Sequence, residues 1–190
     1  MNKRAVAARA ETLLKNNCLI LDTKTTGLGK ADEVIEIAVV NCIGKVIFES
    51  FVKPRRAEVS MQAYQVHRIG PAKLADAPGF AALWRTFAET VKDKTIVAYN
   101  APFDRRLLRQ TCAAWADELP MGAHALEALR INWSCLMQGC TAYNGGRRTS
   151  LTEACNRHSL EPGQPSAASD CRAALALLQT LAGARVALAA

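Results

Sequence analysis

Three aspartates and one lysine are the residues of this 190-residue chain whose types and spacing could support charge-dependent chemistry. Asp22 ends an apolar run at 18–21, and Lys24 follows two residues later. Because successive side chains of a strand alternate between faces, Asp22 and Lys24 are expected to point the same way. Asp104 and Asp170 fall near the starts of two predicted helices, where an acid also stabilises the helix dipole. Each aspartate taken alone is therefore compatible with a purely structural role.

Apolar periodicity predicts the elements that must position these residues. Strands are expected at 17–23, 33–42, 45–54 and 95–100, with a hairpin through Gly44. Helices are expected at 3–15, 79–92, 149–157 and 166–182, and another after Pro102. Residues 54–79 are expected to be irregular, and 115–148 to mix short helices with loops. A meander of three strands followed by alternating helix and strand predicts an α/β fold, with a mixed central sheet flanked by helices.

Length and composition fit one globular domain, because half of the residues are apolar. We expect a single domain over 1–190, with an N-terminal helix in 1–16 and a core at 17–182 that carries the motifs. Ala7, Ala10, Leu13 and Leu14 would form the apolar face of that helix, which does not read as a signal peptide. No apolar run approaches the ~20 residues that cross a bilayer, so no membrane association is expected.

The cysteines and the net charge indicate which cofactors and binding partners suit this chain. The seven cysteines include no C-x-x-C pair and no Cys/His spacing suited to zinc, which favours reduced core residues in a cytoplasmic protein. The net charge of +7 fits an anionic partner such as nucleic acid. Basic clusters occur at 53–56, 105–109 and 147–148, although such clusters are more often solvated faces than phosphate sites.

Three segments carry a family resemblance, "LDTKTTGL…EVIEIAVV", "VAYNAPFDRRLL" and "SAASDCRAALALL". In this order and spacing they resemble the motifs of the DEDD superfamily of 3′–5′ exonucleases, of the DEDDh type. The chain is similar to the branch that contains the DNA polymerase III epsilon subunit and exonuclease X. The resemblance covers about 17–182 and extends to "VHRI" at 66–69 and "TSLTEAC" at 149–155. It implies a ribonuclease H-like fold, four carboxylates that bind two Mg²⁺ or Mn²⁺ ions, and a histidine that activates water.

The resemblance also implies a set of site residues. The catalytic and metal-binding aspartates would be Asp22, Asp104 and Asp170. The substrate would be the 3′ end of single-stranded DNA or RNA. Its terminal nucleotide would lie near six residues: Thr25, Thr26, Gly27, Leu28, Asn100 and Phe103.

Two departures from the family pattern concern the chemistry itself. The first motif reads D-x-E in the family, but here Lys24 stands in place of the glutamate. An ammonium has three donors and no acceptor, so it cannot ligate a cation. The histidine expected five residues before Asp170 is Pro165, and the tyrosine of the variant motif, four residues before, is Ser166. His158 could replace them only if the loop at 158–165 folds back.

Charge explains what Lys24 would do. Three carboxylates and one ammonium leave two net negative charges, against four in the family's set. Lys24 is expected to pair with Asp22 or Asp170, which would raise its pKa, or to contact a phosphate. One weakly held Mg²⁺ or Mn²⁺ ion remains compatible with the set, whereas two are not expected.

Three functional hypotheses follow. The first is a nucleic-acid-binding protein of the exonuclease family with impaired or absent catalysis. The second is a metal-dependent 3′–5′ exonuclease with a non-standard site, which would use Asp22, Asp104 and Asp170. The third is a protein-interaction module that docks a protein partner through the helix at 3–15 or the region 115–148.

Overall fold

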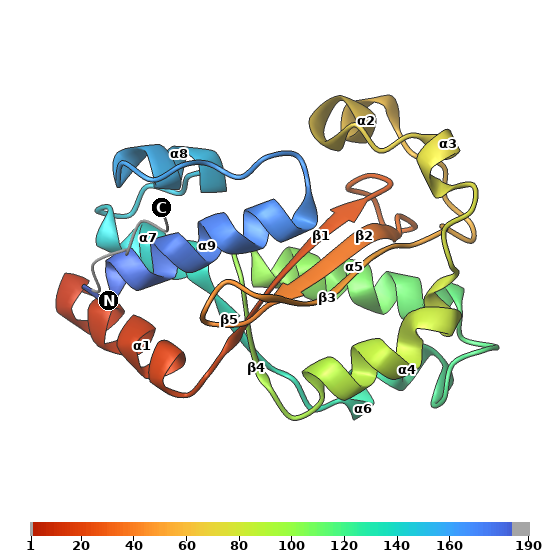
Figure 1. The fold of residues 1–190 in the computed structure, drawn as a ribbon, viewed down its shortest axis with the longest axis horizontal. Helices are drawn as coiled ribbons and strands as arrows, with labels where there is room; N and C mark the ends of the chain where they lie inside the picture. The colour runs from red at the N-terminus through yellow and green to blue at the C-terminus, as the bar shows by residue number, and fades with distance from the viewer. Residues whose placement is uncertain (1, 184–190) are drawn as a thin grey trace.

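A five-stranded mixed sheet forms the centre of the molecule in a computed structural model that describes residues 2–183 (Figure 1). The strand order is β3-β2-β1-β4-β5. The β1–β2 and β2–β3 pairs are antiparallel, whereas the β1–β4 and β4–β5 pairs are parallel. The strands are β1 (Leu19–Thr25), β2 (Val34–Val40), β3 (Val46–Phe51), β4 (Thr95–Ala98) and β5 (Asn132–Cys135). The expected mixed α/β sheet is confirmed; the ends of the expected domain, residue 1 and residues 184–190, lie outside the described part.

Helices cover both faces of this sheet (Figure 1). In chain order they are α1 (Lys3–Lys15), α2 (Met61–His67), α3 (Pro71–Leu74), α4 (Phe80–Val91), α5 (Ala101–Ala114), α6 (Ala125–Ala128), α7 (Leu136–Tyr143), α8 (Leu151–Arg157) and α9 (Ala167–Leu181), with a short 3₁₀ turn at Gly122–His124. On one face, α1, α7, α8 and α9 pack over Ile20 and Val40. On the other face, α4, α5 and α6 pack over Leu21 and Val39.

The alternation along β1 sets the direction of every side chain that follows. Ile20 belongs to the core under α9, and Leu19 and Leu21 belong to the core under α5. With a period of two, the even-numbered residues of β1 point toward α9 and the odd-numbered residues toward α5. β1 therefore presents its polar end to two helices from opposite faces.

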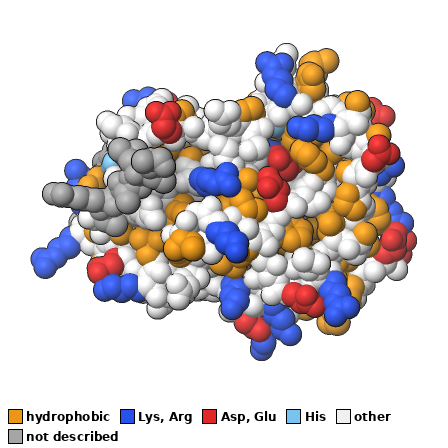
Figure 2. All heavy atoms as spheres, in the orientation of Figure 1, with side chains coloured by type: hydrophobic (Ala, Val, Ile, Leu, Met, Phe, Trp, Pro, Cys, Tyr) orange, Lys and Arg blue, Asp and Glu red, His pale blue; other side chains and the backbone are white. Residues whose placement is uncertain are grey.

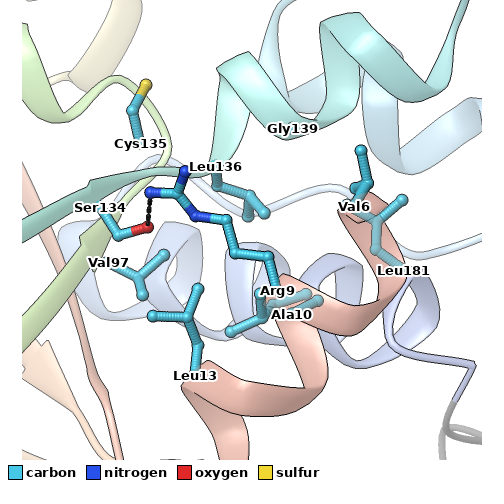
Figure 3. A pocket seen from close by; sticks show the side chains of 11 residues that line it. Val6, Arg9, Ala10, Leu13, Val97, Ser134, Cys135, Leu136, Gly139 and Leu181 are labelled. Atoms are coloured by element: carbon cyan, nitrogen blue, oxygen red, sulfur yellow. Dashed lines mark hydrogen bonds between the residues drawn. The ribbon is translucent and has the colours of Figure 1, made fainter. Parts of the chain in front are cut away.

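The N-terminal helix α1 is docked on the body of the protein (Figure 3). Val6 and Ala10 are buried against α7 and α9, and Arg9 donates a hydrogen bond of 3.1 Å to Ser134 Oγ in β5. The predicted apolar face omitted Val6, which is as buried as Ala10. The cavity that these residues line holds about 20 Å³, which is room for one water. The apolar face of α1 is thus used within the chain.

Two segments differ from the sequence-based expectation. The segment 54–79, expected to be irregular, contains α2 and α3, and the segment 115–148 contains the edge strand β5 as well as short helices. The hairpin at Gly44 is confirmed, with φ +81° at that glycine. All seven cysteines are free, and five of them are buried. No helix among residues 2–183 combines the length and the apolar character that crossing a membrane requires.

Candidate functional site

Lys24 lies between two aspartates that come from opposite ends of the chain. Asp22 and Lys24 are even-numbered residues of β1 and point toward α9, where Asp170 occupies the first turn. The Nζ atom of Lys24 donates to Asp22 Oδ2 at 2.8 Å and also to Asp170 Oδ2. Only 11% of the Lys24 side chain is exposed. The structure therefore brings together the residues that the sequence placed in one cluster, with the ammonium at their centre.

Asp104 joins this cluster from the other face of the sheet. It lies in the first turn of α5, is almost fully buried, and accepts a 2.8 Å hydrogen bond from Thr23 Oγ1. Thr23 is an odd-numbered residue of β1, so it points toward α5 as the alternation requires. Burial and the nearby carboxylate of Asp22 raise the pKa of Asp104 well above its usual value. The environment therefore favours the neutral form of this carboxyl.

The charges of Asp22 and Lys24 depend on each other. Burial raises the pKa of Asp22 to about 6, although the ammonium of Lys24 works in the opposite direction. For Lys24, burial would lower the pKa, but the carboxylates of Asp22 and Asp170 outweigh it and raise the pKa. Lys24 is therefore a permanent cation at any physiological pH.

A second buried acid, Glu36, supports the cluster from β2, and the sequence reasoning missed it. Glu36 pairs with Lys24 in the β1–β2 register and is 4% exposed. Its Oε2 accepts a 3.1 Å hydrogen bond from the backbone N–H of Ala167, the first residue of α9. This contact fixes the start of the helix that carries Asp170. An acid inside the otherwise apolar run at 34–40 was the signal that could have revealed it.

No water-activating side chain occupies the position that the family pattern assigns. Pro165 is exposed, and Ser166 caps α9 by accepting a hydrogen bond from the backbone N–H of Ser169. His158 ends α8 and packs against Tyr143, with 5.7 Å between ring centroids. The loop that follows α8 leads to the start of α9 (Figure 1). His158 thus lies at a helix C-terminus, and no hydrogen bond or ion pair joins it to Asp22, Asp104 or Asp170 within the described residues.

The loop between α8 and α9 crosses directly in front of Asp170. A side chain at Gly163 would overlap the Asp170 carboxylate, and its Cβ would lie 3.0 Å from Asp170 Cα. The absence of a side chain at this position is what allows the close approach. Gly163 is therefore a part of the site that the motif pattern alone did not indicate.

A cleft of about 560 Å³, which we call the β1 cleft, opens beside Lys24. Four of the six predicted substrate residues line it: Thr25, Gly27, Leu28 and Phe103. The opposite wall comes from α2 and its N-cap, with Ser60, Gln62, Ala63, Val66 and His67. The sequence-based list missed this wall, since a helix was not expected there, although it noted "VHRI".

The other two predicted substrate residues lie elsewhere. Thr26 is fully buried, donates to Asp32 Oδ1 at 2.7 Å and accepts from Glu33 N at 3.0 Å, so it shapes the turn behind the cleft. Asn100 lines a different cleft at the end of β4. His67, which lines the β1 cleft, accepts from Ile69 N and donates to Thr25 O at 3.1 Å. Burial lowers the pKa of His67 and favours its neutral form.

The donor set does not fit a two-metal centre. The ammonium of Lys24 bonds directly to oxygens of Asp22 and Asp170, where a divalent cation would need those oxygens as ligands. Within residues 2–183, no group of three or more histidine, cysteine or acidic side chains is arranged to hold a metal ion. What the arrangement offers is a fixed positive charge at the inner end of an open cleft.

Comparisons with known proteins point to one family. The family model RNase_T, described as "Exonuclease", matches residues 19–178. An uncharacterized exonuclease of Escherichia phage 186 is 27% identical over 186 residues, which cover 93% of this chain and 94% of the phage protein. The DNA polymerase III subunit epsilon of Rickettsia conorii is 33% identical over 149 residues, 68% of this chain and 64% of that protein. For the subunit of Rickettsia typhi, the match covers 42% of its length.

Solved structures agree with these sequence matches. Exonuclease X in complex with 5′-overhanging duplex DNA superimposes with a TM-score of 0.62 at 28% identity, covering 88% of this chain and 94% of that one. The E. coli ExoI–ssDNA complex in its zinc-bound form gives a TM-score of 0.69 at 18% identity, over 87% of this chain and 40% of that one. The second similarity supports the fold alone.

Proposed function

Because the chain belongs to the RNase_T exonuclease family, within the DEDD superfamily of 3′–5′ exonucleases, we propose that it binds the 3′ end of a single-stranded nucleic acid without two-metal hydrolysis. The observation that carries this proposal is the ammonium of Lys24, bonded to both Asp22 and Asp170. Members of this family generally use divalent metal ions. The proposal thus separates the fold's ability to hold a strand end from its ability to cut one.

In hydrolysis by paired ions, the two ions together stabilise the attacking and the leaving oxygen, so both ions are required. In this chain one oxygen of Asp22 and one of Asp170 are already bonded to an internal cation, and a second cation close to Lys24 would be repelled. An ammonium binds water only through its N–H donors and has no coordination site of the kind by which a metal ion lowers the pKa of a bound water. We therefore expect at most one weakly held Mg²⁺ or Mn²⁺ ion and no two-metal occupancy.

The loss of the general base is independent of Lys24. Pro165 has no titratable group, and the Ser166 hydroxyl is used in the α9 cap. Positioned acid–base catalysis contributes about 10²–10⁴-fold in rate, so this loss alone would reduce turnover strongly. Two separate departures acting in the same direction favour loss of catalysis over a change of metal.

The β1 cleft retains what strand binding requires. Leu28 and Phe103 offer apolar surface for a base, and Leu28 is 78% exposed at the mouth of the cleft. Lys24 lines the same cleft and uses two carboxylates as partners, so its third N–H can meet a phosphate oxygen. Stacking on apolar and aromatic side chains tolerates any base, which suits a protein that recognises an end and not a sequence.

The test compares binding and hydrolysis in one set of proteins. With 5′-fluorescein-labelled oligothymidylate in EDTA, the wild-type chain is expected to bind, and with Mg²⁺ or Mn²⁺ it is expected to release no nucleotide. The double change Lys24→Glu with Pro165→His restores the family's carboxylate and histidine, and it is expected to gain metal-dependent release from the 3′ end. A single Lys24→Glu change serves as the matched intermediate, with little activity because the base is still missing.

Two results would replace the proposal with its rivals. Metal-dependent release by the wild-type chain, abolished by Asp22→Ala, would identify a working exonuclease with a non-standard site. Failure to bind DNA or RNA of any length at low salt would favour a protein-interaction module instead.

A further inference from the structure

A second cleft, the β4 cleft, opens at the same edge of the sheet as the β1 cleft. It holds about 430 Å³ and is lined by polar groups that include Asn100, Arg148, Thr149 and Ser150. β1 and β4 are parallel neighbours, so their C-terminal ends meet at one edge, with strands about 4.8 Å apart. Because β1 carries Asp22 and Lys24 and β4 leads into Asn100, the two clefts adjoin.

The first turn of α5 stands between the two clefts and connects them. Phe103 lines the β1 cleft and Asn100, the N-cap residue, lines the β4 cleft. Asp104 lies in the same turn, and its backbone N–H donates to Asn100 O at 3.4 Å. A strand whose end occupied the β1 cleft and that passed over this turn would enter the β4 cleft.

The β4 cleft presents donors that the protein itself leaves unused. The Nε atom of Arg148 donates to Met137 Sδ at 3.1 Å, while its two terminal nitrogens have no hydrogen-bond partner within residues 2–183. Arg147 is exposed beside it and is likewise without an ion-pair partner in the described part of the chain. The side chain of Asn100 makes no cap hydrogen bond. Guanidinium and amide donors of this kind match phosphodiester oxygens.

The one acid among the lining residues of this cleft, Glu153, is engaged by contacts within its own helix cap. Glu153 accepts hydrogen bonds from Ser150 N at 2.9 Å and Ser150 Oγ at 3.1 Å in a capping box. The Tyr99 hydroxyl donates to Thr149 O at 2.8 Å and ties this segment to the end of β4. The arginines follow Gly145 and Gly146, both at positive φ with open space around them. Two exposed cations therefore stand beside an anchored segment.

We infer that the β4 cleft binds phosphodiester groups upstream of the 3′-terminal nucleotide, through Arg147, Arg148 and Asn100. This inference rests on the proposed function, because it assigns the path of the strand whose end the β1 cleft holds. It makes affinity depend on strand length: the mononucleotide uses the β1 cleft alone, and longer strands gain the arginine contacts.

The experiment measures binding of thymidine 5′-monophosphate and of 5′-labelled oligothymidylates of increasing length, in EDTA, at several salt concentrations. For Arg147→Ala with Arg148→Ala, mononucleotide affinity is expected to stay unchanged. Affinity for the longer strands is expected to fall about tenfold or more, because hydrogen bonds to charged groups contribute on this scale. The slope of log affinity against log salt concentration should become shallower by about 1.4, because two phosphate contacts to a single strand are lost.

The matched control removes the same charge from the opposite side of the protein. Arg85 pairs with Glu89 and Arg130 with Asp93, both pairs being well exposed. In the variant Arg85→Ala with Arg130→Ala, affinity should still rise with strand length as in the wild type. The conservative variant Arg148→Lys should keep part of this rise. Circular dichroism checks that each variant folds.

Equal losses in the two double variants would overturn the inference, because the effect would then be one of net charge. The inference would also be overturned if affinity rose with strand length in the Arg147/Arg148 variant as much as in the wild type. In that case, binding of the mononucleotide would still support the proposed function. If the wild-type chain bound neither probe, the proposed function would fail, and the inference with it.

Discussion

The ammonium of Lys24 can replace a metal ion electrostatically but not chemically. It neutralises Asp22 and Asp170 and keeps the ends of β1 and α9 together. A metal ion would do the same and would also orient water and accept an oxygen of the scissile phosphate. In the function proposed above, the lysine therefore preserves what folding requires of this cluster and lacks what two-metal hydrolysis would require.

Removing the ammonium should expose that structural role. In Lys24→Ala, two partly buried carboxylates lose their common partner, and the free energy of unfolding is expected to fall by about 2 kcal/mol. The cost is below that of a fully buried pair, because the side chains of Asp22 and Asp170 are 19% and 25% exposed. Urea denaturation at neutral pH in EDTA measures it. Lys15→Ala, which breaks the exposed pair with Glu11, should change stability by less than about 0.5 kcal/mol.

Asp104 should make stability depend on pH in a predictable direction. Burial raises its folded-state pKa above the unfolded value of 3.8, so the folded protein holds this proton more tightly. Stability is then highest below the unfolded pKa and falls as the pH rises toward the folded pKa. Asp104→Asn keeps an acceptor for Thr23 and removes the titration, so the variant should exceed the wild type in stability by an amount that grows with pH.

Urea denaturation from pH 4 to pH 8 in EDTA tests this prediction. Because the pKa of Asp22 is raised to about 6, the stability of the Asp104→Asn variant should still fall somewhat as the pH rises. Asp93→Asn, at an exposed carboxylate paired with Arg130, is the control for the loss of one negative charge. An Asp104→Asn protein that loses stability relative to the wild type as the pH rises would contradict the argument.

For individual residues, the sequence predicted the cluster of Asp22, Lys24, Asp104 and Asp170 but not the residues around it. The shared direction of Asp22 and Lys24 follows from strand alternation, which is a local property, whereas Asp170 entered the expected cluster through the family resemblance. Gly163 and Glu36 could not be found in this way, because their roles depend on the path of a loop and on strand register.

Among the elements, β1 determines the site because it sends Asp22 and Lys24 to one helix and Thr23 to another. The continuous apolar run at 18–21 made it predictable. β5 was missed because Asn132–Cys135 is a four-residue edge strand with little apolar signal. α2 was missed because Met61 and Val66 are 68% and 75% exposed, so no buried stripe marks that helix. Elements that line a cleft lack the periodicity that burial imposes.

The loop between α8 and α9 should tolerate no side chain at Gly163. In Gly163→Ala, the new methyl group would overlap the Asp170 carboxylate, so the loop or α9 must shift. Overpacking of this kind costs about 1–3 kcal/mol, and displacement of Asp170 would also weaken its bond to Lys24. Thermal denaturation measures the effect. Gly139→Ala is the control, because a Cβ there would meet Val6 at an ordinary 3.6 Å.

A Gly163→Ala protein as stable as the Gly139→Ala protein would mean that the loop moves freely away from Asp170. The loop would then be an adjustable cover and not a fixed wall of the site.

At the scale of the whole molecule, the sequence carries a net charge of +7. Figure 2 shows lysine and arginine side chains scattered over one face, with acidic side chains between them. A charge distributed in this way draws any polyanion toward the surface but does not select a binding site. Composition could therefore suggest nucleic acid as a partner, while the clefts had to come from the fold.

The effect of metal ions on the melting temperature distinguishes a cluster held by an internal cation from an empty metal site. A ligand that binds only the folded state at 100 times its dissociation constant adds about 2.7 kcal/mol, which raises the melting temperature of a chain of this size by several degrees. With Mn²⁺ at millimolar concentration, the wild-type melting temperature is expected to stay within about a degree of its value in EDTA at matched ionic strength.

Lys24→Glu replaces the cation by a fourth carboxylate and should gain about 5 °C or more from the same Mn²⁺. Lys24→Gln, which removes the positive charge without adding a ligand, should gain less, and this difference separates coordination from relief of repulsion. An equal gain in the wild type and in Lys24→Glu would mean that Lys24 moves aside for a metal ion. The cluster would then be a metal site closed by a displaceable lysine, and the case against two-metal hydrolysis would rest on Pro165 alone.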